Sequence, residues 1–450
     1  MAVTITPARV AAFDILLKIE RNQGHCDELL RTRQVEVLAS VDRNLCTNLV
    51  MGTLRWQIAL DAQVDASLKR PDNRLSDEVR IALRLGAFQL LHLDRIPAHA
   101  AISESVELAK RAENKFAAGM VNAVLRKVAT GGARSTHESS TPAGVASATA
   151  HPAWLVERWA ENYGLEAAAS ICAFDQEQPP LHVRIVSTDA EEALQQEGIE
   201  IAAASYLTRA RKVIKGDVTA TVAYRKGLVR IQDEGSQLVA ELAGEGTLIL
   251  DCCAAPGGKT TILAENNPAS SIVACDVSMR RLEQMKGLLR ALPEKTQVRF
   301  QVADAAKLLF KDEFDLVLCD VPCSGTGTIA RNPEIRHRLK VEDIVRHKAR
   351  QLIILKSAMA TLKPHGHLLY STCSLEPEEN EQVIAECLQS SPGYRLVSVK
   401  DRLARLVESG ACNVEGAATL ALTGVRNGYL RTLPGVHACD GFFAALLVRD

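Results

Sequence analysis

The stretch TLILDCCAAPGGKTTILAE (residues 247–265) joins a short apolar run, a glycine-rich turn and a helical pattern. So short a run of aliphatic residues predicts a buried strand, and two adjacent glycines let the backbone approach a ligand where a helix begins. The stretch contains Gly-Lys-Thr, but Cys253 stands where a phosphate-binding P-loop requires glycine. The dinucleotide fingerprint is missing as well. The turn therefore predicts a ligand that is neither a nucleoside triphosphate nor a dinucleotide.

Similar apolar runs surround this stretch and alternate with helical patterns. They are LVRIQ before it and SIVACDV, VRFQVAD, FDLVLCDV and HLLYSTC after it. Short unbroken strands that alternate with helices predict a mainly parallel sheet covered on both faces. Ligands of such sheets bind at the carboxyl ends of the strands. We therefore predict an α/β Rossmann-like domain over residues 217–450.

Two of these runs end in acidic residues. Asp276 follows Asp251 by 25 positions, and Asp304 ends the next run. An acidic side chain at the tip of the second strand can accept hydrogen bonds from ribose hydroxyls, and Asp304 could accept one from an adenine amino group. The set suits a nucleoside ligand without phosphates, of which S-adenosylmethionine is the obvious one. The alternative is that Asp276 and Asp304 only cap helices.

The rest of the chain predicts further domains. Apolar residues recur at helical spacing from residue 6 to residue 128, which predicts an all-helical bundle over residues 1–130. Residues 131–150 are small and polar and predict a linker. A helix followed by a strand, helix, strand pattern predicts a small α/β subdomain over residues 151–216.

Composition sets limits on the class of protein. The 450 residues are 47% hydrophobic and 24% charged with a formal net charge of -1, which is ordinary for a globular protein. The first 134 residues hold 19 Lys+Arg against 15 Asp+Glu, a weak hint of a polyanionic partner. The 12 cysteines lack the spacing of a disulfide framework, and neither a signal core nor a membrane-spanning run is present. We expect a reduced, cytoplasmic protein without a membrane segment or a metal.

Two cysteines each follow an apolar run: Cys323 in DVPCSGTG and Cys373 in YSTCS. One reaction that would use two such thiols is the methylation of carbon 5 of cytosine. This carbon is too weak a nucleophile to attack a sulfonium methyl until a thiolate adds to carbon 6. A second acid or base then helps to remove the carbon-5 proton and release the enzyme. The chemistry does not assign the two roles, and a Pro-Cys nucleophile, as in DNA cytosine methyltransferases, would favour Cys323. The alternative is that both thiols are small core residues.

Four motifs in order, DCCAAPGGKT, DVPCSGTG, ARNPEIRHRLKVED and YSTCSLEPEENE, resemble those of the bacterial 16S ribosomal RNA cytosine-C5 methyltransferases of the Sun/RsmB type. DRNLCTNLVMGTLRW resembles the NusB-like RNA-binding domain that this type carries ahead of its catalytic domain. The resemblance implies that Cys373 attacks carbon 6, that Cys323 assists release and that Asp320 holds N3 of the base.

The resemblance also implies S-adenosylmethionine as cofactor and 16S ribosomal RNA, free or in an early small-subunit assembly intermediate, as the partner of a monomer. Arg331 and Arg336 follow the Pro-Cys turn closely, so we predict that they contact RNA phosphates, although charge runs are often only solvated helix faces. A DNA cytosine methyltransferase and a noncatalytic RNA-binding assembly factor are the competing functions. The implied cofactor contacts are Cys253, Ala254, Ala255, Pro256, Gly257, Gly258, Lys259, Asp276, Asp304 and Asp320.

Overall fold

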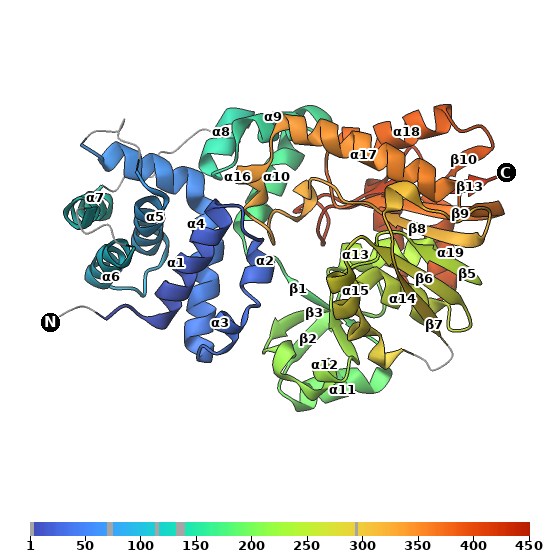
Figure 1. The fold of residues 1–450 in the computed structure, drawn as a ribbon, viewed down its shortest axis with the longest axis horizontal. Coiled ribbons are helices and arrows are strands. Elements are labelled where there is room, and N and C mark those ends of the chain that lie inside the picture. Colours follow the sequence, from blue (N-terminus) through green and yellow to red (C-terminus); the bar gives the residue numbers. More distant parts are fainter. Residues whose placement is uncertain (1–3, 70–74, 113–116, 132–139, 293–295) are drawn as a thin grey trace. The chain divides into compact units, whose positions relative to one another are not determined.

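The computed structural model describes residues 4–69, 75–112, 117–131, 140–292 and 296–450 (Figure 1). The chain forms two compact units. The first comprises Met1–Gln178 and Ile329–Arg338, and the second comprises Pro179–Thr328 and Leu339–Asp450. No helix among the described residues is long and apolar enough to cross a bilayer.

The first unit begins as a helical bundle, as predicted. Gly52 of the longest helix allows close packing, because a Cβ there would lie 1.9 Å from the ring of Phe88. Phe88 belongs to the buried apolar core of this bundle, and Gly52 is itself buried. The helices are α1 (Pro7–Glu20), α2 (Cys26–Leu29), α3 (Arg33–Glu36), α4 (Ser40–Ser67), α5 (Asp77–His92), α6 (Ala98–Arg111) and α7 (Ala118–Thr130).

The predicted linker is partly helical. Within residues 131–150, Pro142–Ala148 form α8, while residues 132–139 lie outside the described residues. The Thr141 side chain accepts a hydrogen bond from Gly144 N, and Val145 and Ala146 are buried. The prediction of an unstructured linker was therefore wrong for α8, because an N-cap and two small apolar side chains suffice to order one short helix against α9 (Ala153–Tyr163).

The predicted α/β subdomain is divided between the units. Its helices α9 and α10 (Leu165–Gln176) belong to the first unit, and its strands to the second. These strands, β1 (Leu181–Ile185), β2 (Glu200–Ala203) and β3 (Ala210–Lys215), form a sheet of order β2-β3-β1-β4, with α11 (Thr188–Gln196) between β1 and β2. The strand β4 (Val229–Ile231) pairs antiparallel with β1 of this small sheet. The prediction that LVRIQ is a strand of the large sheet was therefore wrong.

The large sheet of the second unit has the order β11-β12-β13-β9-β8-β5-β6-β7, and β10 pairs with β13. Five strands are parallel, as predicted: β5 (Leu248–Asp251), β6 (Ser271–Asp276), β7 (Gln297–Val302), β8 (Phe314–Asp320) and β9 (Leu362–Thr372). The antiparallel strands are β10 (Tyr394–Val397), β11 (Val425–Arg426), β12 (Tyr429–Arg431) and β13 (Phe443–Arg449).

Helices complete the domain around this sheet (Figure 1). After β5 the chain adds β6 and β7 on one side of this strand and then β8 and β9 on its other side. A crevice for a ligand is expected at the carboxyl end of β5, where the strand order changes direction. The helices are α12 (Val222–Arg225), α13 (Glu234–Ala243), α14 (Gly258–Asn266), α15 (Met279–Lys286), α17 (Val341–Met359), α18 (Glu381–Gln389), α19 (Val399–Glu408) and α20 (Val414–Thr419). The short helix α16 (Ile335–Arg338) belongs to the first unit.

Candidate active site

The glycine-rich turn lies between the end of β5 at Asp251 and the start of α14 at Gly258. Gly257 has a φ of 107°, in the left-handed region, and a Cβ there would lie 2.4 Å from Met285 Cγ. A Cβ at Gly258 would lie 3.2 Å from the Gln232 amide. Both crowding and backbone conformation therefore require glycine at residue 257, which keeps this helix N-terminus open to a ligand.

Three acidic residues lie at strand ends beside the turn. Asp251 is 1% exposed, and its Oδ1 has no hydrogen-bond partner among the described residues, while Oδ2 accepts from Thr260 at 2.6 Å. Burial, with a smaller contribution from the charge of Asp320, raises the pKa of Asp251 to about 7. Asp276 is 6% exposed and accepts from Ser278 N at 2.9 Å. An unsatisfied buried oxygen and a buried carboxylate fit a polar ligand at this edge of the sheet.

Asp304 caps a helical turn in the structure, which is the alternative interpretation that the sequence left open beside a contact with adenine. Its Oδ1 accepts from Ala306 N at 3.0 Å, and its side chain is exposed. A carboxylate has acceptor capacity beyond one such bond, so the cap leaves Asp304 able to accept another.

The two thiols lie next to each other. Cys323 follows β8 and Cys373 follows β9, and these neighbouring parallel strands pair in register to their ends, with Asp320 opposite Ser371. The Sγ atoms of Cys323 and Cys373 are 3.3 Å apart. The sequence prediction that two thiols lie at the ends of two strands is confirmed, and the structure brings them into contact.

The two thiols differ in their surroundings. The pKa of Cys323 lies well above its usual range, first because it forms a hydrogen bond with Cys373, then because it is buried and because Cys373 and Glu379 contribute negative charge. A raised pKa favours the protonated thiol of Cys323, and either sulfur can donate in the hydrogen bond between the two.

Asp320 and Lys259 form an ion pair beside the thiols. Lys259 Nζ lies 2.7 Å from Asp320 Oδ2, and Ser371 Oγ donates to Asp320 Oδ1 at 2.7 Å. Burial alone would lower the pKa of Lys259, but the charge of Asp320 and its hydrogen bond outweigh burial, and Cys373 adds to the effect, so the pKa is raised. The Lys259 ammonium therefore stays charged beside the Asp320 carboxylate and near the Cys373 sulfur.

Glu379 connects the two thiol-bearing loops and was not predicted. It is 0% exposed and accepts hydrogen bonds from three directions: Ser324 N at 2.9 Å, Gln351 Nε2 at 2.9 Å and Ser374 Oγ at 2.7 Å. Ser324 follows Cys323, and Ser374 follows Cys373. The same Gln351 amide donates to Pro322 O at 3.0 Å. One buried carboxylate thus fixes the residues next to both thiols.

The two arginines predicted to contact RNA lie in the segment that belongs to the first unit. Arg336 is 2% exposed and donates hydrogen bonds to the carbonyl oxygens of Arg55, Ala150 and Asp175. An RNA phosphate cannot reach a guanidinium enclosed in this way, so the prediction for Arg336 was wrong. Arg331 is half-buried and stays a prediction.

We expect Arg336→Ala to lower the free energy of unfolding by about 2 to 4 kcal/mol, because buried carbonyls lose their donors and the cavity left behind cannot collapse fully. Thermal unfolding measures this loss. The exposed Arg346, which pairs with Asp343 of its own helix, is the matched control, and Arg346→Ala should change stability by less than about 0.5 kcal/mol. Equal stability of the two variants would contradict the structural role of Arg336.

The strand order, the open helix N-terminus after β5 and the paired thiols after β8 and β9 define the class of this domain, which is a Rossmann-like methyltransferase domain. Residues 239–448 match the family described as 16S rRNA methyltransferase RsmB/F. Residues 6–130 match the NusB family, and residues 151–215 match the ferredoxin-like domain of RsmF/B-like methyltransferases.

The chain is 35% identical to a probable ribosomal RNA small subunit methyltransferase B of Bacillus subtilis, over 97% of this chain and 98% of that protein. It is 34% identical to a ribosomal RNA small subunit methyltransferase B of Pseudomonas putida, over 88% of this chain and 91% of that protein. The solved structure of PH0851 shares the fold, with a TM-score of 0.80, 23% identity and coverage of 99% and 100%. A methyltransferase homologue of Pyrococcus horikoshii covers 67% of this chain and 96% of its own, with a TM-score of 0.53 and 25% identity.

The chain therefore belongs to the RsmB family of 16S rRNA methyltransferases. The enzyme class predicted from the motifs, an rRNA cytosine-C5 methyltransferase, is confirmed by this membership. So are the three predicted kinds of domain: the NusB-like helical domain, the small α/β subdomain, which matches a ferredoxin-like domain, and the α/β catalytic domain.

Proposed function

We propose that this protein methylates carbon 5 of one cytosine in 16S ribosomal RNA through a covalent bond between Cys373 and carbon 6. The observation that carries the proposal is the pair of thiols 3.3 Å apart beside the Asp320–Lys259 ion pair. We further propose that the protein acts as a cytoplasmic monomer, on free RNA or on an early assembly intermediate of the small subunit.

In the first step, the Cys373 thiolate adds to carbon 6 of the cytosine. The electron pair of the broken carbon 5–carbon 6 π bond moves to carbon 5 and, through carbon 4, toward N3, which takes up a proton from water and returns it when the double bond forms again in the last step. Asp320 accepts hydrogen bonds from Lys259 and Ser371, as an ionised carboxylate does, so it can hold that proton on N3 by accepting one more. Lys259 supports the thiolate before addition, because its ammonium is held charged next to Cys373.

In the last step, the carbon-5 proton leaves, carbon 5 and carbon 6 regain their double bond, and the sulfur of Cys373 departs as a thiolate. We assign Cys323 as the base because its pKa depends on whether Cys373 is free or bonded to carbon 6. Its pKa is raised chiefly by the hydrogen bond with Cys373 and also by the charge of Cys373. Once Cys373 is bonded to carbon 6 and uncharged, these two causes are removed, while burial and the charge of Glu379 remain. The pKa of Cys323 therefore falls at this stage, and after it releases its own proton to water it can accept the carbon-5 proton.

The cofactor that we propose is S-adenosylmethionine, which supplies an electrophilic methyl group on a sulfonium when bound. The turn of residues 253–259 brings its backbone to the N-terminus of α14, and its two glycines carry no side chain that would stand between that backbone and a ligand. The buried carboxylates of Asp251 and Asp276 stand at the ends of β5 and β6, and Asp276, which also pairs with Arg281, is the one that we propose to accept from a ribose. These groups fit a nucleoside with a cationic centre and offer no phosphate cradle.

We expect Asp276→Ala to weaken binding of S-adenosylmethionine about 10- to 100-fold, as for the loss of roughly 1.5 to 3 kcal/mol of hydrogen bonding to a charged group. Calorimetric titration measures the affinity. Asp312→Ala, an exposed Asp of the same unit that pairs with Arg449, is the control and should bind normally. An unchanged affinity in the Asp276 variant would remove this residue from the cofactor site.

Two assays test the function against its competitors. The purified protein should transfer methyl groups to undermethylated 16S RNA and not to DNA, and bisulfite sequencing of RNA from a deletion strain should show one cytosine without its methyl group. Transfer to DNA instead of RNA would favour the DNA methyltransferase. Binding of RNA without transfer to any substrate would favour an assembly factor.

A further inference from the structure

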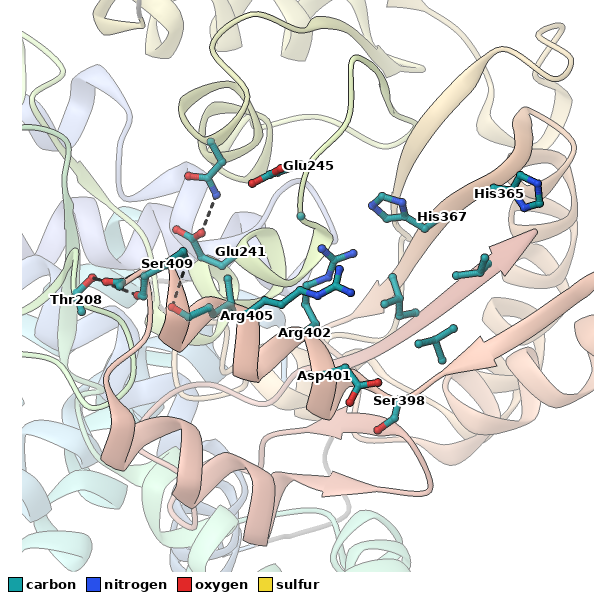
Figure 2. Close-up of a pocket in the computed structure, with 18 of the residues that line it drawn as sticks. Thr208, Glu241, Glu245, His365, His367, Ser398, Asp401, Arg402, Arg405 and Ser409 are labelled. Carbon is teal, nitrogen blue, oxygen red and sulfur yellow. Dashed lines mark hydrogen bonds between the residues drawn. The ribbon is translucent and has the colours of Figure 1, made fainter. Parts of the chain in front are cut away.

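A cavity of about 710 Å³ lies in the second unit, away from the thiols (Figure 2). Its lining includes Gly244 and Glu245, which come just before β5, and His365 and His367, near the start of β9. It therefore lies at the amino ends of the parallel strands. His367 and Cys373 are six residues apart along β9, which at ~3.3 Å per residue separates them by roughly 20 Å. The cavity is a different site from that of the two thiols.

Two arginines of α19 dominate this cavity. Arg402 and Arg405 are three residues apart and share one face of the helix. Figure 2 shows their guanidinium groups side by side and turned toward His367. Among the residues that the structure describes, neither guanidinium has a hydrogen-bond or ion-pair partner. Gly244 makes room for one of them, because a Cβ at that position would lie 2.2 Å from Arg402 Nη1.

The charges around the two arginines leave a positive potential between them. Burial first, and the charge of Arg405 second, lower the pKa of Arg402, and the opposing effect of Glu245 is smaller. Burial, followed by the charge of Arg402, lowers the pKa of His367 to about 4, with a further contribution from Arg405 and an opposing one from Asp315. The ring of His367 is therefore neutral at physiological pH, with Nε2 donating to Ala243 O at 3.1 Å.

Most other charged groups of the lining have partners. Glu241 binds Arg184 and Asn266, Arg395 pairs with Asp450, and Arg209 lies 3.9 Å from Glu265. Glu245 and Asp401 are the remaining acidic residues of the lining. Two adjacent guanidiniums without a carboxylate partner form a double fork that matches the oxygens of a phosphate group.

We propose that this cavity binds a backbone phosphate of the RNA substrate, at a nucleotide some distance along the strand from the target cytosine. The proposal rests on the proposed function, because it takes the ligand to be the same RNA whose cytosine reaches the thiols. The separation of roughly 20 Å along β9 suits a second contact on one RNA molecule. A cavity of this volume also has room for a nucleotide.

The test compares two RNA substrates with the double variant Arg402→Gln/Arg405→Gln. For undermethylated full-length 16S RNA we expect the KM to rise about tenfold, with kcat little changed, because an ionic contact remote from the chemistry contributes to binding. The slope of log affinity against log salt should become shallower by roughly 0.7 for each phosphate that the variant no longer binds. For a short RNA that extends only a few nucleotides beyond the cytosine, the variant should equal the wild type. Arg426→Gln, an exposed arginine of β11 outside the cavity, is the control.

A second measurement identifies the source of the phosphate. Inorganic phosphate that binds between the two arginines should raise the pKa of His367 toward its ordinary value, which titration by nuclear magnetic resonance can follow, with His367→Gln to assign the signal. Phosphate could raise the pKa of His367 in the wild type while the double variant shows unchanged RNA affinity and an unchanged salt slope. That result would indicate a site for a free phosphate compound and would overturn the RNA assignment. No effect of phosphate and no effect on RNA would overturn the site altogether. If the wild type transfers no methyl group, the proposed function fails, and the RNA affinity of the variant still decides on the cavity.

Discussion

Cys373→Ala will abolish methyl transfer and leave no covalent RNA adduct, because without addition to carbon 6 the cytosine carbon 5 stays too weak a nucleophile. Methyl transfer to RNA, followed by a denaturing gel for slowly migrating protein, measures both parts of the expectation.

Cys323→Ala should have the opposite result on the gel. Addition and methylation proceed, but the carbon-5 proton lacks its base, so protein accumulates covalently joined to methylated RNA. The loss of the hydrogen bond between the two thiols should also change the reactivity of Cys373, which alkylation over a range of pH can follow.

Controls separate chemistry from packing. Cys46→Ala makes the same change at a buried cysteine in the first unit and should keep full activity. If the trapped adduct appears with Cys373→Ala, and Cys323→Ala shows no chemistry, then the roles are reversed and the mechanism follows the DNA methyltransferase pattern. If neither variant differs from the wild type, the two-thiol mechanism is wrong for this protein.

Glu379→Ala should lower kcat by about 100-fold or more, because a misplacement of ~1 Å at reacting groups can cost that much. The change leaves Ser324 N, Ser374 Oγ and Gln351 Nε2 without their common acceptor, so the loops that carry both thiols are no longer held together. Affinity for S-adenosylmethionine should change little, since the hydrogen bonds of Glu379 go to the thiol-bearing loops and to α17 rather than to the turn after β5.

Two further variants distinguish misplaced thiols from a general loss of stability. Glu379→Gln keeps the size and one acceptor oxygen but turns an amide donor toward another donor, so it should recover part of kcat at a temperature well below unfolding. The matched control is Glu386→Gln in α18. It removes a carboxylate that forms a surface ion pair with Lys348 of α17, and the variant should be fully active. If Glu379→Ala retains normal kcat, the carboxylate does not position the thiols.

The sequence was most informative where one physical cause dominates. Unbroken apolar runs predicted β5, β6, β8 and β9 because strands buried on both faces need no alternation, whereas β7 was found from a mixed run and is largely exposed. Cys323 and Cys373 were found because each follows such a run. Glu379 was missed because it stands in EPEENE among other acidic residues, and burial depends on the fold around it. Arg336 was misjudged for the same reason: a basic run looks solvated until three carbonyls from distant segments enclose it.

The segment Ile329–Arg338 has a consequence for how the protein is made. The first unit closes around residues that follow Gln178 by some 150 positions, so during synthesis its helices leave the ribosome long before Arg336 can donate to their carbonyl oxygens. At ~5–20 residues per second the delay is on the order of 10 to 30 s. The amino-terminal helices can collapse early, but their final packing must wait until the chain has passed through the Pro-Cys turn of the catalytic domain. Maturation of the two units is therefore linked in time by the order of translation.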